Sequence, residues 1–411
     1  MKHLKKTWQG SSAKRRNTAL FLFVFLGMLT AFGPFVTDMY LPSLPAMTSY
    51  FNAGTSAVQL GLTFSMLGLA AGQILFGPLS DKYGRRAPLL ISMWLFLAST
   101  LACIFAPNIQ TFVVLRLVQG MAAAGGIVIS RSIATDKFKG ANLAKALAII
   151  GAINGIAPVA APVLGGAVLK VTGWRGVFGI LFVLGLALTA ACVHFNESLS
   201  RAKRSREKLS QTFSLFKTVL RKRKYVFCVL QMAFALAILF GYIAASPFII
   251  QQHYGFSPFA FSLFFAANAV AIGTGAGISV KFKRLENCIL TSCIGMLVFS
   301  GLSLAAMAAG AGVALFEGLL FALLFTVGMT LTAATTLAMD AARDQAGTAS
   351  ALLGAAGFLF GSVVSPLVGL GDILISTGTA SALLGAAGSF VCGLIAVRRE
   401  PCTKCAGEAA V

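Results

Sequence analysis

Apolar residues occur along this chain in long runs that are separated by short polar segments. The run that begins at Ala19, ALFLFVFLGMLTAFGPFV, is typical. A helix needs about 20 residues to cross the hydrocarbon core of a bilayer, and the runs lack the alternation of barrel strands. The pattern therefore predicts an all-α membrane protein with twelve transmembrane helices, at about residues 18–41, 57–77, 88–106, 110–131, 144–168, 174–194, 225–249, 258–280, 287–309, 312–338, 347–370 and 373–397.

One polar interruption is much longer than the others and divides the predicted helices into two groups of six. It reads FNESLSRAKRSREKLSQTFSLFKTVLRKRK. Its basic residues favour a solvated linker held near anionic lipid. We predict a cytoplasmic N-terminal tail, an N-terminal six-helix half, a cytoplasmic basic linker, a C-terminal six-helix half and a cytoplasmic tail, at residues 1–17, 18–194, 195–224, 225–397 and 398–411 respectively.

The two halves share a weak internal repeat with an offset of about 204 residues, which indicates a duplicated architecture. Three positions of the fifth predicted helix recur in the eleventh: Gly151, Pro162 and Gly165 match Gly354, Pro366 and Gly369. Parallel halves are typical of transporters whose substrate site lies between the halves and opens to each side in turn.

The composition agrees with a membrane protein, since 57% of the residues are hydrophobic and 11% are charged, whereas soluble domains contain about 25% charged residues. The net charge of +21 suggests nucleic-acid binding at first. However, apart from Arg116, the Lys and Arg residues lie in the tails and in or next to alternate connections, and the predicted outer connections hold only Lys170 and Arg175. This distribution follows the positive-inside rule, places both termini in the cytoplasm and argues against a nucleic-acid partner.

The N-terminal segment resembles a secretory signal because basic residues precede an apolar run. The run is too long, no A-x-A-like cleavage site follows it, and further helices come after it, so we interpret it as the first transmembrane helix. We expect a multi-pass monomer in the cytoplasmic (inner) membrane of a bacterium.

Motifs for enzymatic chemistry are missing from the sequence. It contains no G-x-x-x-x-G-K-[ST] phosphate loop, no H-E-x-x-H and no G-x-S-x-G. Cys402 and Cys405 form a C-x-x-C in a tail where thiols stay reduced, and the three histidines are isolated. We therefore expect no enzymatic activity, no metal and no cofactor, with a proton gradient as the energy source.

Asp38 and Arg116 lie inside predicted helices, where a charge costs roughly 2.5 to 3.5 kcal/mol on insertion scales. At about 1.5 Å per residue both fall in the outer third of the bilayer, a depth that is compatible with a direct or water-bridged pair. Because burial and nearby cations change the proton affinity of a carboxylate, such a site could take up a proton on one side and release it on the other. The sequence leaves open whether Arg116 reaches the outer surface instead, and whether Asp38 binds the proton, the substrate or each in turn. Glu317 is a second candidate.

The connection after the second helix, GPLSDKYGRRAP at residues 77–88, places a compact charge cluster at the inner surface. Judged on its residues alone, this connection is either an ordinary positive-inside turn or a charge cluster that contacts a neighbouring helix end and separates from it when the halves move. It resembles the signature of the major facilitator superfamily, Gly-x-Leu-x-Asp-x-x-Gly-Arg-Arg. The resemblance implies a conformational latch that holds the halves in the outward-facing state, with matches at Gly77, Leu79, Asp81, Gly84, Arg85 and Arg86.

Two further helices resemble motifs of the same superfamily. VLRLVQGMAAAGG is similar to its fourth-helix motif, which implies a role for Arg116 in proton coupling. GAINGIAPVAAPVLGGAVL resembles the fifth-helix motif of its antiporters, although Ala157-Pro158 replaces the usual Gly-Pro and small residues at this spacing also serve ordinary helix packing. The motif residues are Gly151, Gly155, Pro158, Pro162, Gly165 and Gly166.

The stretch TDMYLPSLPAM, at residues 37–47, closely resembles the first-helix signature of the Bcr/CflA drug-resistance transporters, within the twelve-span drug:proton antiporters. SPFIIQQHYGFSPFAFSLFFAANA and AGTASALLGAAGFLFG are similar to the seventh-to-eighth and eleventh helices of that group. The resemblance covers nearly the whole chain and implies export of drugs in exchange for protons.

A cavity with few polar groups among 34 phenylalanines suits lipophilic, drug-like ligands. The polar residues in or near the helices are Tyr40, Gln59, Gln73, Asn154, Gln231, Tyr242 and Asn268. The leading hypothesis is a proton-coupled exporter of amphiphilic drugs or related small molecules by alternating access. The alternatives are a proton-coupled exporter of one endogenous metabolite, such as a nucleoside or amino-acid derivative, acid-driven uptake by symport and, more remotely, a non-transporting membrane receptor or scaffold.

Overall fold

The computed structural model describes residues 18–204, 216–343 and 346–397, and this part of the chain is helical except for its connections. Eleven helices among the described residues are long and apolar enough to cross a membrane, which confirms the all-α prediction. The elements are α1 (Ala19–Asp38), η1 (Leu41–Ser43), α2 (Leu44–Phe51), α3 (Thr55–Tyr83), α4 (Arg86–Ile104), α5 (Ile109–Lys137), α6 (Gly140–His194), η2 (Arg201–Lys203), α8 (Arg223–Phe248), η3 (Ile249–His253), α9 (Pro258–Ser279), α10 (Leu285–Ala308), α11 (Val313–Ala341), α12 (Ala346–Leu367) and α13 (Ile373–Val397).

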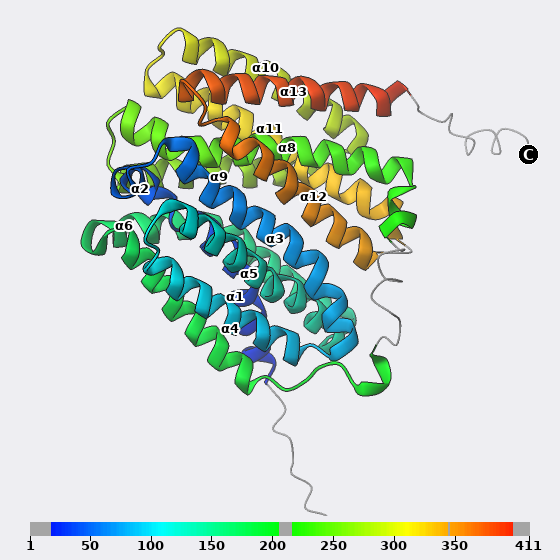
Figure 1. The fold of residues 1–411 in the computed structure, drawn as a ribbon. Coiled ribbons are helices and arrows are strands. Elements are labelled where there is room, and N and C mark those ends of the chain that lie inside the picture. Colours follow the sequence, from blue (N-terminus) through cyan, green and yellow to red (C-terminus); the bar gives the residue numbers. More distant parts are fainter. Residues whose placement is uncertain (1–17, 205–215, 344–345, 398–411) are drawn as a thin grey trace, which may run out of the picture.

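Helix α6 accounts for the difference between these eleven helices and the twelve predicted. It contains 55 residues, and a straight helix of that length would extend about 80 Å, whereas the hydrocarbon core is about 30 Å thick. The helix is interrupted at Gly173, where φ is 68°, a left-handed value that favours glycine. Figure 1 shows that α6 doubles back at the end of the bundle near α2. The two arms of α6 therefore correspond to the fifth and sixth predicted helices.

Local capping determines where several helices begin. Helix α5 follows Asn108, whose side chain accepts a hydrogen bond from a backbone N–H of the first turn at 2.8 Å. Helix α9 follows Ser257, which caps in the same way at 3.2 Å, and its first residue is Pro258. Proline suits this position because the first N–H of a helix has no partner within the helix.

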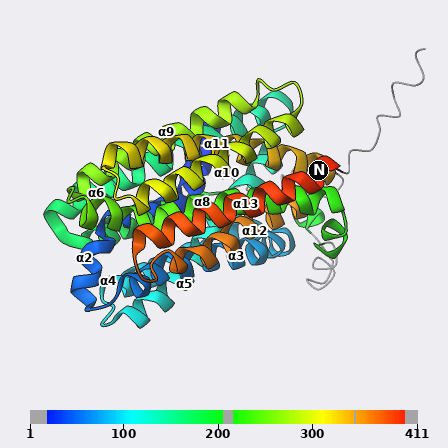
Figure 2. The same ribbon diagram turned by 90° about the horizontal axis from the view of Figure 1, so that it is seen from above.

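Two six-helix halves lie side by side. In Figure 1 the N-terminal half, α1 to α6, is drawn from blue to green and the C-terminal half, α8 to α13, from green to red. Helix α3 packs on α12, and α6 packs on α9. Seen from above, α13 runs along α8 and α10 (Figure 2). We call the end of the bundle that contains η1, α2 and Gly173 the η1 end, and the end that contains residues 84–86 and 195–204 the linker end.

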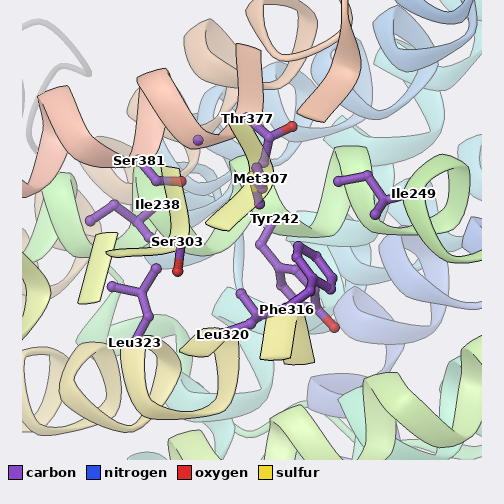
Figure 3. Close-up of a pocket in the computed structure, with 11 residues that line it drawn as sticks. Ile238, Tyr242, Ile249, Ser303, Met307, Phe316, Leu320, Leu323, Thr377 and Ser381 are labelled. Atoms are coloured by element: carbon purple, nitrogen blue, oxygen red, sulfur yellow. The ribbon is translucent and has the colours of Figure 1, made fainter. Parts of the chain in front are cut away.

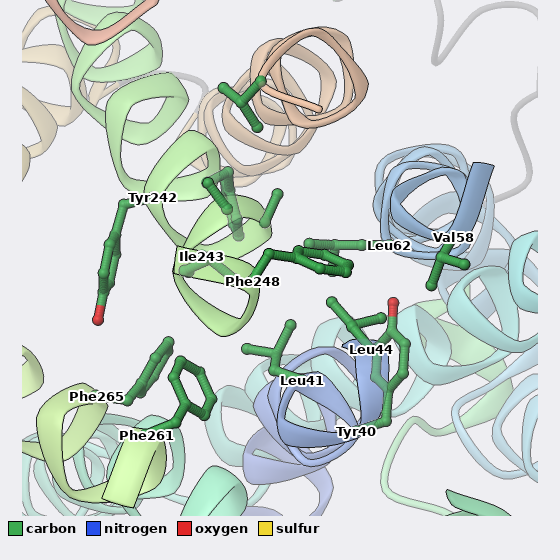
Figure 4. Packing of buried hydrophobic residues seen from close by; sticks show 14 of the residues in the cluster. Tyr40, Leu41, Leu44, Val58, Leu62, Tyr242, Ile243, Phe248, Phe261 and Phe265 are labelled. Carbon is green, nitrogen blue, oxygen red and sulfur yellow. The ribbon is translucent and has the colours of Figure 1, made fainter. Parts of the chain in front are cut away.

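Buried side chains form three hydrophobic clusters. One lies within the N-terminal half and one within the C-terminal half. The third takes residues from both halves near the η1 end. Figure 4 shows part of it, with Tyr40 and Tyr242 on opposite sides of Leu41 and Phe248. The halves are therefore packed against each other at the η1 end.

Candidate functional site

Arg85, between α3 and α4, is the centre of an ion-pair cluster at the linker end. Its Nε donates to Asp136 Oδ2 at 2.9 Å, and its Nη1 donates to Ser80 Oγ at 2.9 Å and to Asp81 Oδ1. Burial lowers the pKa of Arg85, but the carboxylates of Asp136 and Asp81 outweigh it and raise that pKa above its ordinary value. The guanidinium therefore remains charged.

Gly84 and Glu197 join this cluster to the start of the linker. Gly84 has a φ of 93°, and a Cβ there would lie 2.5 Å from Glu197 Oε2. The Glu197 carboxylate accepts hydrogen bonds from the backbone N–H groups of Arg85 at 2.9 Å and Arg86 at 3.2 Å. It sits at the N-terminus of α4, where a negative charge is favourable. Neither Glu197 nor Asp136 is among the residues predicted from the sequence.

The other residues of the latch motif contact only nearby elements. A Cβ at Gly77 would lie 3.6 Å from Val128, an ordinary contact. Arg86 donates to Val193 O at 2.7 Å, and the side chain of Asp81 is 55% exposed. In the described part of the chain, the hydrogen bonds and ion pairs of this cluster stay within the N-terminal half and the start of the linker.

Arg116 is fully buried in α5, and backbone carbonyls and aromatic rings balance its charge. Its Nη2 donates to Val36 O at 2.9 Å, its Nε donates to Gly61 O at 3.4 Å, and its Nη1 donates to Gln119 Oε1. The guanidinium lies over the ring of Tyr40, 4.2 Å from the ring centroid. Such a cation–π contact is strongest where water is excluded.

Asp38 occupies the last turn of α1, is 5% exposed and has no ion-pair partner among the described residues. A direct ion pair with Arg116 is not formed, because the guanidinium is directed towards Val36, Gly61 and Gln119; the water-bridged alternative stays a prediction. The segment η1 follows Asp38 closely and packs on α8 and α9 of the other half. A movement of the two halves would therefore change the surroundings of Asp38.

Two contacts between the halves repeat each other near the η1 end. Ser56 of α3 donates to Pro366 O of α12 at 3.4 Å. Ser262 of α9 donates to Pro162 O of α6 at 2.7 Å. Pro162 and Pro366 are also equivalent positions of the internal repeat. The same type of serine-to-proline hydrogen bond thus joins the halves in both helix pairs, α3 with α12 and α6 with α9.

The glycines of the α6 motif differ in what surrounds them. A Cβ at Gly165 would lie 1.8 Å from Met39 O, and one at Gly166 would lie 2.5 Å from Ser262 Oγ. A Cβ at Gly155 would meet no atom within 4 Å. The remaining motif residues are Pro158 and Pro162, which lie inside the same helix, and Gly151, whose surroundings lie outside the described residues.

A polar cluster in the C-terminal half joins α8, α9 and α11. Asn268 Nδ2 lies 3.0 Å from Tyr242 Oη and 3.1 and 3.2 Å from the two carboxylate oxygens of Glu317. Asn268 and Tyr242 are buried, and Glu317 is half-buried. This arrangement brings two predicted cavity residues together with the second candidate carboxylate.

The other predicted cavity residues lie apart from this cluster. Gln59 donates through Nε2 to Ala244 O of the other half at 2.9 Å, and its Oε1 is buried without a partner. Gln231 contacts Cys293 Sγ at 2.8 Å inside the C-terminal half. The side chain of Asn154 lies outside the described residues. Among the described cavity residues, Gln59 and Gln231 therefore make contacts of their own and do not join the hydrogen bonds of the Asn268 cluster.

A narrow crevice lies inside the C-terminal half, between α8, α10, α11 and α13 (Figure 3). Its lining is mostly apolar and includes Tyr242, Phe316 and Leu320. Ser303 also lines it, is 5% exposed and has an Oγ without a hydrogen-bond partner. Across the described residues, no group of three or more His, Cys, Asp or Glu side chains is arranged to hold a metal ion.

Comparison with known proteins agrees with this fold. The family model of the Major Facilitator Superfamily matches residues 20–366. The chain is 36% identical over 359 residues to an uncharacterized MFS-type transporter, YdgK of Bacillus subtilis (strain 168), which covers 86% of this chain and 89% of the relative. It is 26% identical over 367 residues to a bicyclomycin resistance protein homolog of Haemophilus influenzae, over 86% of this chain and 90% of the relative. Its fold is similar to that of the E. coli xylose transporter XylE in a partially occluded inward open conformation, with a TM-score of 0.68, 16% identity and coverage of 93% and 98% of the two chains.

Proposed function

The chain belongs to the Major Facilitator Superfamily, and on this premise we propose that it is a drug:proton antiporter of the Bcr/CflA group. It exports amphiphilic drugs or related small molecules by alternating access, with the proton gradient as its energy source. The relative from Haemophilus influenzae is named as a bicyclomycin resistance protein homolog, which supports export of drug-like compounds.

The observation that carries this proposal is the buried, unpaired carboxylate of Asp38. An ionised carboxylate without a counter-charge is costly away from water, so Asp38 needs a proton or a cationic ligand group while the η1 end is closed. Separation of the halves at that end would admit water and allow exchange of the proton. Arg116 provides a fixed positive charge nearby, and a movement that brings Asp38 towards it would replace the proton as counter-charge.

We assign the η1 end to the periplasmic side of a bacterial inner membrane, because basic residues gather in the tails and connections at the linker end. Both termini are then cytoplasmic. Ser56 and Ser262 bond across the halves at this end, which supports our inference that the periplasmic side is closed and that this conformation faces the cytoplasm. The protein acts as a monomer in the lipid bilayer.

The Arg85 cluster is the proposed conformational latch. In the cytoplasm-facing conformation Arg85 pairs within its own half, and the Asp81 side chain is 55% exposed. Closure of the linker end would bring the C-terminal half to this exposed carboxylate. The outward-facing conformation would then be stabilised by a contact between Asp81 and the C-terminal half, which the cytoplasm-facing conformation lacks.

Inverted membrane vesicles from an overexpressing strain test the proposal. After an inside-acid gradient has been formed, addition of an amphiphilic drug should collapse part of it, as followed with a pH-sensitive dye. Vesicles without the protein provide the control. A response to a single nucleoside or amino-acid derivative would indicate a metabolite exporter, and no proton movement across a broad panel of compounds would contradict antiport.

A further inference from the structure

The polar cluster of Glu317, Asn268 and Tyr242 contains a carboxyl group without a counter-ion among the described residues. Among the described residues, no Lys, Arg or His side chain forms an ion pair with Glu317. Glu317 lies about 6 Å along α11 from its first residue, at about 1.5 Å per residue. The cluster therefore sits near the η1 end, beside the part of the interface that must open for release of a substrate.

The hydrogen bonds in this cluster leave the carboxylate with unused acceptor capacity. The Asn268 amide carries two N–H groups, and it faces three oxygen atoms at 3.0 to 3.2 Å: the Tyr242 hydroxyl and both oxygens of Glu317. An ionised carboxylate offers about four lone-pair sites. Asn268 thus orients Glu317 but does not saturate it, and a donor or a cation is needed to complete the site.

Aromatic rings surround the cluster. The Tyr242 and Phe265 rings are stacked, with centroids 5.8 Å apart and an interplanar angle of 20°. Phe316, the neighbour of Glu317 in the chain, packs on Tyr254 with centroids 5.7 Å apart. Aromatic faces attract cations, and this attraction strengthens as water is excluded.

The crevice between α8, α10, α11 and α13 adjoins the polar cluster. Tyr242 belongs both to its lining and to the polar cluster, and in Figure 3 its hydroxyl points away from Ser303 and Ser381. Ser303, which is buried and has no hydrogen-bond partner for its Oγ, lies along the same lining. The crevice has a volume of about 10 Å³, which is about the size of one water molecule, so in this conformation it marks an apolar edge of the cluster and does not itself hold a ligand.

We propose that Glu317 binds the positive group of an amphiphilic organic cation, with Asn268 holding the carboxylate and the apolar part of the ligand lying against the Tyr242 and Phe316 rings. The inference rests on the proposed export function and names a substrate class for it. A metal ion is disfavoured as the occupant because hard cations need several oxygen ligands, and among the described residues Glu317 belongs to no group of three or more His, Cys, Asp or Glu side chains that could hold one.

Binding of radiolabelled tetraphenylphosphonium to the purified full-length protein tests the proposal. This probe carries a permanent charge and no proton. Glu317→Gln should weaken its binding about tenfold or more, since a charge-assisted contact is lost, while binding of the neutral amphiphile chloramphenicol changes less than twofold. Glu317→Asp, which keeps the charge, should retain more of the phosphonium binding. The matched control is Asp340→Asn, which removes a carboxylate that is 47% exposed and paired with Arg343.

Three outcomes would overturn the cation site: wild-type protein without saturable phosphonium binding, Glu317→Gln with wild-type affinity, or equal loss of both probes in Glu317→Gln. Equal loss would mean that Glu317 supports the structure or carries a proton. These failures differ from failure of the proposed function, in which vesicles show no proton movement with neutral compounds although the purified protein binds the phosphonium.

Discussion

At the scale of single residues, the sequence predicts that a buried charge has polar partners, but it does not identify every partner. The cost of a charge in hydrocarbon predicts that Arg116 must have polar partners, and it has them. Two of these partners are the backbone carbonyls of Val36 and Gly61. Every residue has a carbonyl, so no side-chain pattern marks these positions. Glu197 was missed for a related reason, since it binds backbone N–H groups of the latch motif.

Two substitutions of Tyr40 separate the contribution of its ring, which covers Arg116, from that of its hydroxyl group. The hydroxyl is buried without a partner, so Tyr40→Phe should change the free energy of unfolding by less than about 0.5 kcal/mol. Tyr40→Leu removes the ring that lies 4.2 Å from the guanidinium and should cost about 2 kcal/mol. Thermal unfolding of the purified variants measures both effects. Equal destabilisation by the two substitutions would refute the stacking account.

At the scale of helices, the internal repeat acquires a structural meaning. The matched prolines 162 and 366 both offer a carbonyl to a serine of the opposite half. The sequence predicted that glycine and proline recur in these two helices. It did not predict the serine partners, because helix neighbours cannot be read from one chain and serine is common in membrane helices. The repeat therefore identified the helices at the interface but not the bonds across it.

Two glycines of the α6 motif provide a matched pair for testing close packing. Gly165→Ala would place a Cβ 1.8 Å from Met39 O, and this overpacking should cost about 1 to 3 kcal/mol and impair transport. Gly155→Ala meets no atom within 4 Å and should be neutral or stabilise the helix by up to about 1 kcal/mol. Thermal unfolding together with drug efflux from cells measures the difference. Indistinguishable variants would show that the motif glycines do not act through packing at this helix face.

At the scale of the whole molecule, hydropathy predicted most span boundaries closely, for example 287–309 against the observed Leu285–Ala308 of α10, but α3 and α5 continue to Tyr83 and Lys137, beyond their predicted ends at 77 and 131. The reason is that the bilayer imposes both helix and length on an apolar run. The closed end of the molecule could not be predicted. Two conformations of a transporter use the same residues and differ by only a few kcal/mol, so the pattern of the chain is equally compatible with either.

Proteoliposomes that contain only the purified chain test the central claim most directly. An inside-acid pH gradient should drive the wild-type protein to accumulate a labelled neutral drug above its external concentration. Asp38→Asn should fold and bind the drug but should not accumulate it, because the buried side chain no longer carries a proton, whereas Asp340→Asn should behave as the wild type. Accumulation by Asp38→Asn at the wild-type level, or wild-type transport that ignores the gradient, would contradict the account.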